Sequence, residues 1–333
     1  MFSRDIGIDL GTANVLIHVK GKGIVLDEPA VVAMDRSSDK VLAVGEEAYK
    51  MVGRTPGNIE AIRPLKNGVI ADFDVTEAML RHFIDKINVK GFLSKPRMLI
   101  CCPTNITKVE QKAIKQAAEK SGGRKVYLEE EPKVAAIGAG MEIYLPSGNM
   151  VIDIGGGTTD VAVLSMGDIV TAESIKIAGD TFNRDILQYI KKEYKLLIGE
   201  RTAEDIKKNI ATVFEGARDE SIDIRGRDMV SGLPKTITVY SDEVEKCLRE
   251  SVSLILQSAK SVLENTPPEL SADIIDRGVI LTGGGAMIHG IDKLLAEELK
   301  VPVLVAEEAM HCVATGTGLM LQNIDKIEKS PML

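Results

Sequence analysis

The chain has 333 residues, of which 44% are hydrophobic and 27% are charged, and its formal net charge is −8 at pH 7. This length and composition favour a globular protein of two domains. An acidic chain with no tryptophan and few other aromatic residues is poorly suited to nucleic-acid binding, so we expect no nucleic-acid partner. The four cysteines show no metal-binding spacing and are expected to be free thiols in a reducing cytoplasm.

Strand and helix patterns alternate along the first part of the chain, which predicts an α/β sheet. Apolar residues at helical spacing predict a helix over 74–88. Thr107 and Glu110 form a capping-box signature that opens a second helix, which ends before Gly122. Pro132 is expected in the first turn of a third helix. The strands expected around these helices cover residues 5–10, 14–19, 24–34, 97–102 and 125–129.

The second part of the chain repeats this plan. It has strand patterns at 149–154, 160–165 and 168–177, a long helix at 241–265, and a strand, helix, strand and helix over 276–321. We therefore expect two related halves, each with a small insertion. The first half is residues 1–141, with a core of 1–32 and 71–141, an insertion at 33–70 and an added C-terminal segment of about 315–333. The second half is residues 142–314, with a core of 142–179 and 246–314 and an insertion at 180–245.

Two glycine-rich turns repeat one pattern, 144 residues apart. The first follows Asp9 and the second follows Asp153, and each leads through Gly and Thr into another apolar run. This pattern predicts a β-hairpin with a glycine-rich turn in each half. Glycine lets successive backbone N–H groups approach one anion, and an adjacent carboxylate suits hydrated Mg²⁺. A single such turn is most often an ordinary hairpin, but the repeat predicts two turns that share one phosphate site.

A third glycine-rich turn, Gly283-Gly284-Gly285, joins an apolar strand pattern to a helical pattern. Three successive glycines offer a surface free of side chains on which a purine can lie, although such a turn is commonly only structural. The P-loop pattern and the G-x-G-x-x-G fingerprint between a strand and a helix are both absent from the sequence. The phosphate site must therefore be of another kind.

The order of the three turns resembles that of the actin superfamily, which also includes heat-shock chaperone ATPases and sugar kinases. Finer motifs, Glu130-Glu131-Pro132, Gly199–Glu204 and Thr266–Leu270, resemble the bacterial actins of the MreB family, most closely its Mbl branch. The resemblance runs from Ile6 to about Leu321. It implies an actin-like (ribonuclease H-like) ATPase fold with two related halves around a nucleotide cleft.

The resemblance also implies roles for individual residues. Asp9 and Asp153 would hold Mg²⁺ largely through water, while Glu131 and Thr158 would act on the attacking water. Glu204 and Lys207 would bind the ribose hydroxyls, and the alternative for these two residues is an exposed ion pair. Actin carries a lysine shortly after the first turn, but in this chain the corresponding position falls near Leu16. The residues expected to contact the phosphates are Gly11, Thr12, Ala13, Asn14, Gly156, Gly157 and Thr158, and those expected beside adenine are Gly284, Gly285, Ala286 and Met287.

In function, the resemblance implies a slow ATPase that polymerises with ATP into cytoskeletal filaments governing rod cell shape and cell-wall synthesis. Expected partners are further copies of the chain, the cell-wall elongation machinery and membrane adaptor proteins. No apolar run is long enough to span a membrane, so contact with the inner face of the cytoplasmic membrane would be peripheral. Phe92 and Leu93, flanked by basic residues, are candidates for shallow insertion, unless they fold back onto the core. The alternatives are a chaperone ATPase and a small-molecule kinase.

Overall fold

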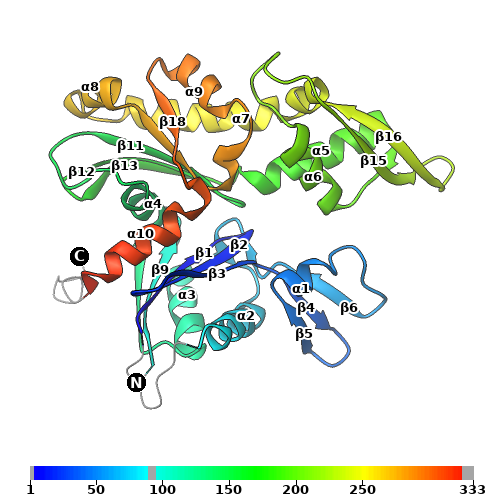
Figure 1. Cartoon of the computed structure of the whole chain (residues 1–333), viewed down its shortest axis with the longest axis horizontal. Helices are drawn as coiled ribbons and strands as arrows, with labels where there is room; N and C mark the ends of the chain where they lie inside the picture. Colours follow the sequence, from blue (N-terminus) through cyan, green and yellow to red (C-terminus); the bar gives the residue numbers. More distant parts are fainter. Residues whose placement is uncertain (1–3, 89–94, 325–333) are drawn as a thin grey trace.

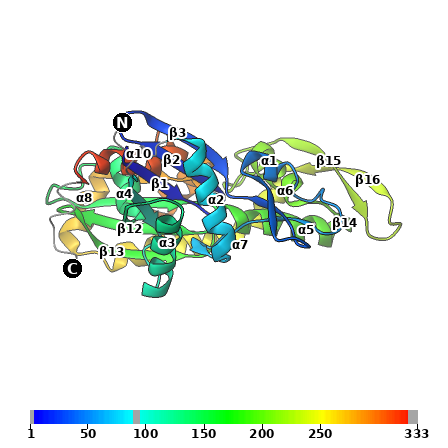
Figure 2. The ribbon, with the colours of Figure 1, turned by 90° about the horizontal axis from the view of Figure 1, so that it is seen from below.

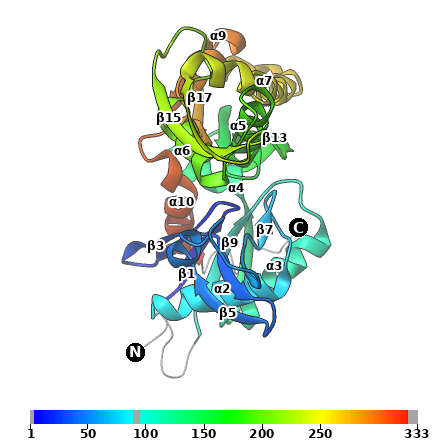
Figure 3. The ribbon, with the colours of Figure 1, turned by 90° about the vertical axis from the view of Figure 1, so that its right-hand side faces the viewer.

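Within residues 4–88 and 95–324, which the computed structural model describes, the chain contains two five-stranded sheets of matching topology. Their strand orders are β10-β9-β1-β2-β3 and β18-β17-β11-β12-β13. In both sheets the first three strands pair in parallel, and the last two pairings are antiparallel. Figures 1 and 3 show one sheet above the other. The repeat seen in the sequence is therefore a repeat of topology.

The first sheet is covered by helices on both faces. On its outer face, α2 (Phe73–Lys86) and α3 (Lys108–Lys120) pack against each other and complete an apolar core with the strands. The predicted capping box opens α3, because the Thr107 hydroxyl accepts from the N–H of Glu110 and the Glu110 carboxylate accepts from the N–H of Thr107. The strands are β1 (Ile6–Leu10), β2 (Asn14–Val19), β3 (Gly23–Pro29), β9 (Arg97–Cys102) and β10 (Lys125–Glu130).

The strand predicted over 24–34 is wrong, because this segment forms two strands in different sheets. β3 pairs with β2 in the large sheet, whereas β4 (Val32–Asp35) pairs with β5 (Lys40–Val44) and β6 (Ile59–Ile62). The chain changes sheets just after Pro29, which has no N–H to donate, and the N–H of Ala30 donates to the carbonyl of Ala13 instead. A short helix, α1 (Glu46–Tyr49), and a hairpin of β7 (Leu65–Lys66) and β8 (Val69–Ile70) complete this region.

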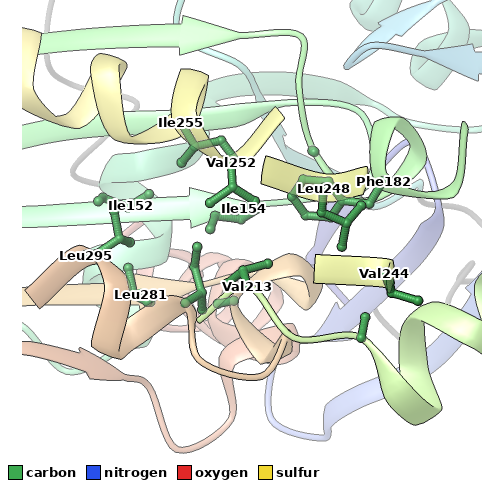
Figure 4. Close-up of a cluster of buried hydrophobic side chains, with 14 of the residues drawn as sticks. Ile152, Ile154, Phe182, Val213, Val244, Leu248, Val252, Ile255, Leu281 and Leu295 are labelled. Carbon is green, nitrogen blue, oxygen red and sulfur yellow. The ribbon is translucent and has the colours of Figure 1, made fainter. Parts of the chain in front are cut away.

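The second sheet has its own apolar core on the face that α5, α7 and α9 cover, drawn in Figure 4. Its strands are β11 (Asn149–Ile154), β12 (Thr159–Ser165), β13 (Asp168–Ile175), β17 (Val279–Thr282) and β18 (Val303–Val305). The helices of this half are α5 (Gly179–Glu193), α6 (Glu200–Ile210), α7 (Ser241–Glu264), α8 (Pro268–Arg277) and α9 (Ile291–Leu299). A small sheet of β14 (Leu196–Leu197), β15 (Ser221–Asp228) and β16 (Pro234–Tyr240) extends to the right in Figures 1 and 2.

Two helices, α4 (Glu131–Gly138) and α10 (Cys312–Leu321), lie between the large sheets and share an apolar core with both. They cross at glycines. A Cβ atom at Gly138 would collide with the carbonyl of Cys312, and one at Gly316 would collide with the carbonyl of Val134. The two backbones therefore touch at the crossing. None of the helices in the described residues combines the length and hydropathy that a membrane span requires.

Candidate functional site

The first glycine turn, residues 11–14, connects β1 to β2 as an antiparallel hairpin, as predicted. A Cβ atom at Gly11 would lie 2.7 Å from the carbonyl oxygen of Asn14, so this tight turn requires glycine. Thr12 is buried, and its hydroxyl accepts a hydrogen bond of 3.0 Å from the N–H of Gly68. The side-chain Nδ2 of Asn14 donates to Oδ1 of Asp27 on β3, at 2.8 Å.

The second glycine turn, residues 155–158, connects β11 to β12 in the same manner. It lies directly against the first turn, since a Cβ atom at Gly156 would be 2.7 Å from the Cβ of Ala13. A Cβ atom at Gly157 would be 2.5 Å from the hydroxyl oxygen of Thr12. Two turns that belong to different sheets and lie 144 residues apart in sequence therefore meet at one point.

The hairpin between β7 and β8 also reaches this point. Its turn residues, Asn67 and Gly68, have φ angles of 52° and 75°, the left-handed conformation of a tight hairpin turn. A Cβ atom at Gly157 would lie 3.0 Å from the Cα of Asn67. The sequence did not predict a place for this turn at the site, because nothing local to its Asn-Gly pair indicates contact with the glycine turns.

Acidic side chains collect beneath the two turns. Burial, reinforced by the charge of Asp153, raises the pKa of Asp9 to about 8. Burial also raises the pKa of Asp153 to about 7, although the Thr282 hydroxyl donates to its carboxylate across 2.8 Å and opposes the shift. Burial and the charge of Asp160 raise the pKa of Glu131, at the start of α4, well above its usual value. Negative charges are therefore crowded here in a place where a cation would stabilise them.

Asp160 is a buried member of this group to which the sequence analysis gave no role. Its Oδ1 accepts hydrogen bonds from the backbone N–H of Thr104 at 3.1 Å and from the Thr104 hydroxyl at 2.9 Å. Burial raises its pKa, and the Thr104 hydrogen bonds oppose that shift. Thr104 follows β9 of the first sheet, whereas Asp160 lies on β12 of the second. This contact therefore joins the two halves beside the glycine turns.

Lys207, on α6, lies beside the second glycine turn. Its Nζ donates to the carbonyl of Gly179 at 3.0 Å, and the N–H of Gly179 in turn donates to the carbonyl of Gly155. Burial lowers the pKa of Lys207. Glu204, one turn earlier on α6, accepts from the Tyr49 hydroxyl and pairs with Lys208 at 2.7 Å. The structure thus brings Lys207 to the turns and gives Glu204 protein partners on both of its oxygens.

The third glycine turn begins a 3₁₀ helix, Gly284–Met287, immediately after β17. Cβ atoms at Gly283 and Gly285 would collide with Ile154 on β11, so these two glycines allow close packing between the turn and the sheet. Gly284 is different, because a Cβ atom there would meet only the Met310 side chain, at 3.7 Å. The predicted flat surface is therefore restricted to the outer side of the turn.

Comparison with known proteins assigns the chain to a family. The family model described as MreB/Mbl protein matches residues 3–329. The chain belongs to the MreB/Mbl family. It is 79% identical over 329 residues to the cell shape-determining protein Mbl of Bacillus subtilis, covering 99% of both chains. It is 50% identical to the cell shape-determining protein MreB of Escherichia coli, covering 98% of this chain and 95% of MreB.

Solved structures of relatives agree with this assignment. MreB5 of Spiroplasma citri bound to AMPPNP superposes with a TM-score of 0.93 at 42% identity, covering 98% of both chains. The subunit of the MamK double helical filament has a TM-score of 0.79 at 18% identity, covering 99% of both chains, and this likeness shows the fold alone. The predicted actin-like fold is confirmed. Phe92 and Leu93, the expected membrane residues, lie outside the described residues.

Proposed function

We propose that this MreB/Mbl-family protein is an actin-like ATPase that polymerises with ATP into filaments governing rod cell shape and cell-wall synthesis. The observation that carries the proposal is the contact between the two glycine turns, at Ala13 and Gly156. Backbone N–H groups from both halves can surround one anion there, which suits a nucleotide's phosphates. A relative with the same fold, MreB5, binds AMPPNP and ADP. The family assignment favours this function over the chaperone and kinase alternatives.

In this proposal the first turn and the second turn hold the β- and γ-phosphates through backbone N–H groups. Mg²⁺ fits the crowded carboxylates, and Asp9 and Asp153 would hold it mostly through water, because Mg²⁺ dehydrates reluctantly. Mg²⁺ would supply neutralising charge to the phosphates, and the Lys207 ammonium group lies close enough to the second turn to add to it.

Hydrolysis requires a water molecule in line with the γ-phosphate, and the protein's contribution is to position it. Glu131 begins α4, is almost fully buried and lies among the acidic residues under the turns. We assign it the role of orienting the water, with the Thr158 hydroxyl as a second hydrogen-bonding group. Hydrolysis is expected to be slow, because a filament-coupled ATPase benefits when assembly precedes hydrolysis.

On the nucleoside side, Glu204 is assigned to the ribose hydroxyls, and a carboxylate keeps free lone pairs beyond those used by Tyr49 and Lys208. Lys207 is assigned to the ribose and the adjoining phosphates. The outer side of the third turn, from Gly284 to Met287, faces the adenine. The two halves, divided near residues 141 and 314, would close on the nucleotide because both supply phosphate contacts.

For partners, we propose self-assembly together with peripheral attachment at the inner face of the cytoplasmic membrane through Phe92 and Leu93. Adaptor proteins and the cell-wall elongation machinery would complete the assembly.

Light scattering with and without Mg–ATP tests the function. The wild-type chain at micromolar concentration should assemble with ATP, and Asp153→Asn should not. Asp39→Asn, a matched change in the exposed β4–β5 turn, should assemble normally. A wild-type chain that stays monomeric with ATP, also on anionic vesicles, would refute the proposal.

A further inference from the structure

The short helix α1, which packs on the small sheet of the first half, meets α6 of the second half. The hydroxyl of Tyr49, the last residue of α1, donates to Oε2 of Glu204 at 2.5 Å. The Arg201 guanidinium, also on α6, lies 5.2 Å from the centre of the Tyr49 ring. An ion pair of 3.7 Å between Arg63 and Glu200 joins the same two regions. In Figure 1, α6 lies above α1.

The Glu204 carboxylate is held by both halves of the chain. Its Oε1 pairs with Nζ of Lys208, on the same helix, at 2.7 Å, whereas its Oε2 accepts from Tyr49 of the first half. Burial alone would raise the pKa of Glu204, but the hydrogen bonds from Lys208 and Tyr49 outweigh burial and lower it. The carboxylate is therefore ionised at neutral pH, and it can accept further hydrogen bonds through the lone pairs that remain.

Glu204 also lies close to the second glycine turn. Nζ of Lys207 donates to the carbonyl of Gly179, and the N–H of Gly179 donates to the carbonyl of Gly155 in that turn. Residues three apart on a helix share one face, so Glu204 is a neighbour of Lys207. In a nucleotide the ribose follows the phosphates. An acceptor next to the phosphate turns is therefore matched to the ribose hydroxyls, which are donors.

We propose that Tyr49 is a positioning residue for ribose recognition: from the first half it fixes the Glu204 carboxylate of the second half for the ribose hydroxyls. This inference rests on the proposed function, which assigns Glu204 to the ribose, and it adds the residue on which that selection depends. Without the Tyr49 hydroxyl, Glu204 keeps only Lys208, whose side chain is 66% exposed. A less ordered carboxylate loses more conformational entropy when it binds the ribose, so the ribose hydrogen bonds contribute less to affinity.

A purely structural role for these contacts predicts a different result. The Arg63–Glu200 pair joins the same two regions as Tyr49 but does not include Glu204. If the contacts only hold the halves together, loss of either one weakens the binding of every nucleotide by the same factor. If Tyr49 positions Glu204, loss of its hydroxyl weakens only those nucleotides that carry ribose hydroxyls.

Equilibrium dialysis of radiolabelled ATP and 2′,3′-dideoxy-ATP, with Mg²⁺ and below the protein concentration of assembly, tests the proposal. The dideoxy compound lacks both ribose hydroxyls and keeps the base and the phosphates. The wild type should bind ATP about tenfold more tightly or better, because hydrogen bonds to a charged carboxylate are strong. Tyr49→Phe should reduce this ratio of affinities by about threefold or more, through weaker ATP binding. Glu204→Ala should bring the ratio close to one.

Two variants serve as controls. Glu200→Gln weakens the contact between the same two regions and should keep the wild-type ratio. Tyr144→Phe makes the same chemical change on a ring that is 69% exposed, and it should keep both affinities. Because both nucleotides are measured on the same variant, a partial loss of folded protein changes the number of sites and leaves the ratio unchanged.

The outcomes separate this inference from the proposed function. A wild-type ratio in Tyr49→Phe, with a ratio near one in Glu204→Ala, would refute the inference and leave Glu204 assigned to the ribose. An equal fall in Tyr49→Phe and Glu200→Gln would refute it too, as would a higher ratio in Tyr49→Phe, since Tyr49 would then compete with the ribose. A wild-type ratio near one, or an unchanged ratio in Glu204→Ala, would refute the ribose assignment and the inference together. Failure of the wild type to bind ATP would refute the proposed function itself.

Discussion

The hydroxyl of Tyr49 donates a 2.5 Å hydrogen bond to Oε2 of Glu204, although the two residues lie 155 positions apart. Tyr49 ends α1 beside the first large sheet, and Glu204 lies on α6 of the second half. Nearby, the Arg201 guanidinium lies 5.2 Å from the centre of the Tyr49 ring, and Nε of Arg63 lies 3.7 Å from Oε2 of Glu200. Helix α6 therefore contacts the other half through Glu204, the residue that we assign to the ribose.

Replacing Tyr49 by Phe should weaken this connection. A hydrogen bond to a charged group contributes about 1.5–3 kcal/mol, so the free energy of unfolding should fall by an amount in that range. Urea unfolding of the nucleotide-free protein measures it. Tyr144→Phe, on an exposed ring, is the control and should leave the free energy of unfolding unchanged. Equal stability of Tyr49→Phe and the wild type would show that the Tyr49 hydroxyl does not hold the halves together.

Glu131→Gln should separate binding from hydrolysis. The amide keeps the size of the side chain but orients water less effectively, so ATP affinity should stay close to normal while single-turnover hydrolysis slows by roughly 10²–10⁴-fold. Glu130→Gln is the matched control, because Glu130 is the preceding residue and its pKa is also raised by burial. An unchanged single-turnover rate in Glu131→Gln, or an equal loss in both variants, would remove Glu131 from the proposed role.

The double variant Phe92→Ala with Leu93→Ala should release the protein from anionic vesicles. Each inserted side chain would contribute roughly 1.5–3 kcal/mol, so a single copy would bind weakly and a filament strongly, through many copies at once. Vesicle co-sedimentation with ATP measures the effect. Retained vesicle binding by the variant would place the membrane contact elsewhere, whereas a large loss of thermal stability would mean that these side chains belong to the core.

Asp228 should titrate far below an ordinary aspartate. The N–H of Ser231, the Lys235 ammonium and the N–H of Val230 lower its pKa from 3.8 to about 2. Because the folded pKa is below the unfolded one, its stabilisation of the loop between β15 and β16 is complete above pH 4 and is lost as the pH falls from 4 to 2. Carbon-detected NMR titration measures this pKa, and the amides of residues 229–233 should lose protection from exchange in Asp228→Asn. An ordinary pKa near 4 would contradict the hydrogen bonding described here.

Local sequence patterns predicted the local structure well. Each hairpin around a glycine turn follows from two apolar runs separated by Gly and Thr, and the capping box at Thr107 follows from a three-residue spacing. The exception is the segment 24–34, in which two apolar runs flank Asp27-Glu28-Pro29 and join different sheets after Pro29. Periodicity alone does not show which partner a strand will have, because pairing depends on distant residues.

The contacts between the two halves could not be predicted from the sequence. Tyr49 with Glu204, and Thr104 with Asp160, join residues that are far apart in the chain and carry no pattern of their own. Asp160 did offer a signal, since it is an acidic residue two positions after Thr158 of the second turn, at the start of an apolar run. The fold also brings Lys207 from α6 to the second turn, where its Nζ donates to the carbonyl of Gly179, and no local pattern in the sequence indicated this placement.

The placement of α10 has a consequence for how the protein is made. This late helix packs on β1, where a Cβ atom at Gly7 would collide with Thr317, and on β2, where one at Gly318 would collide with the His18 ring. During synthesis the first sheet therefore emerges long before the helix that covers its inner face. Domains at the start of a chain generally fold while the ribosome is still working. The part of this apolar face that lies under α10 therefore stays uncovered until nearly the whole chain has been translated, whereas the part under α4 can be covered much earlier.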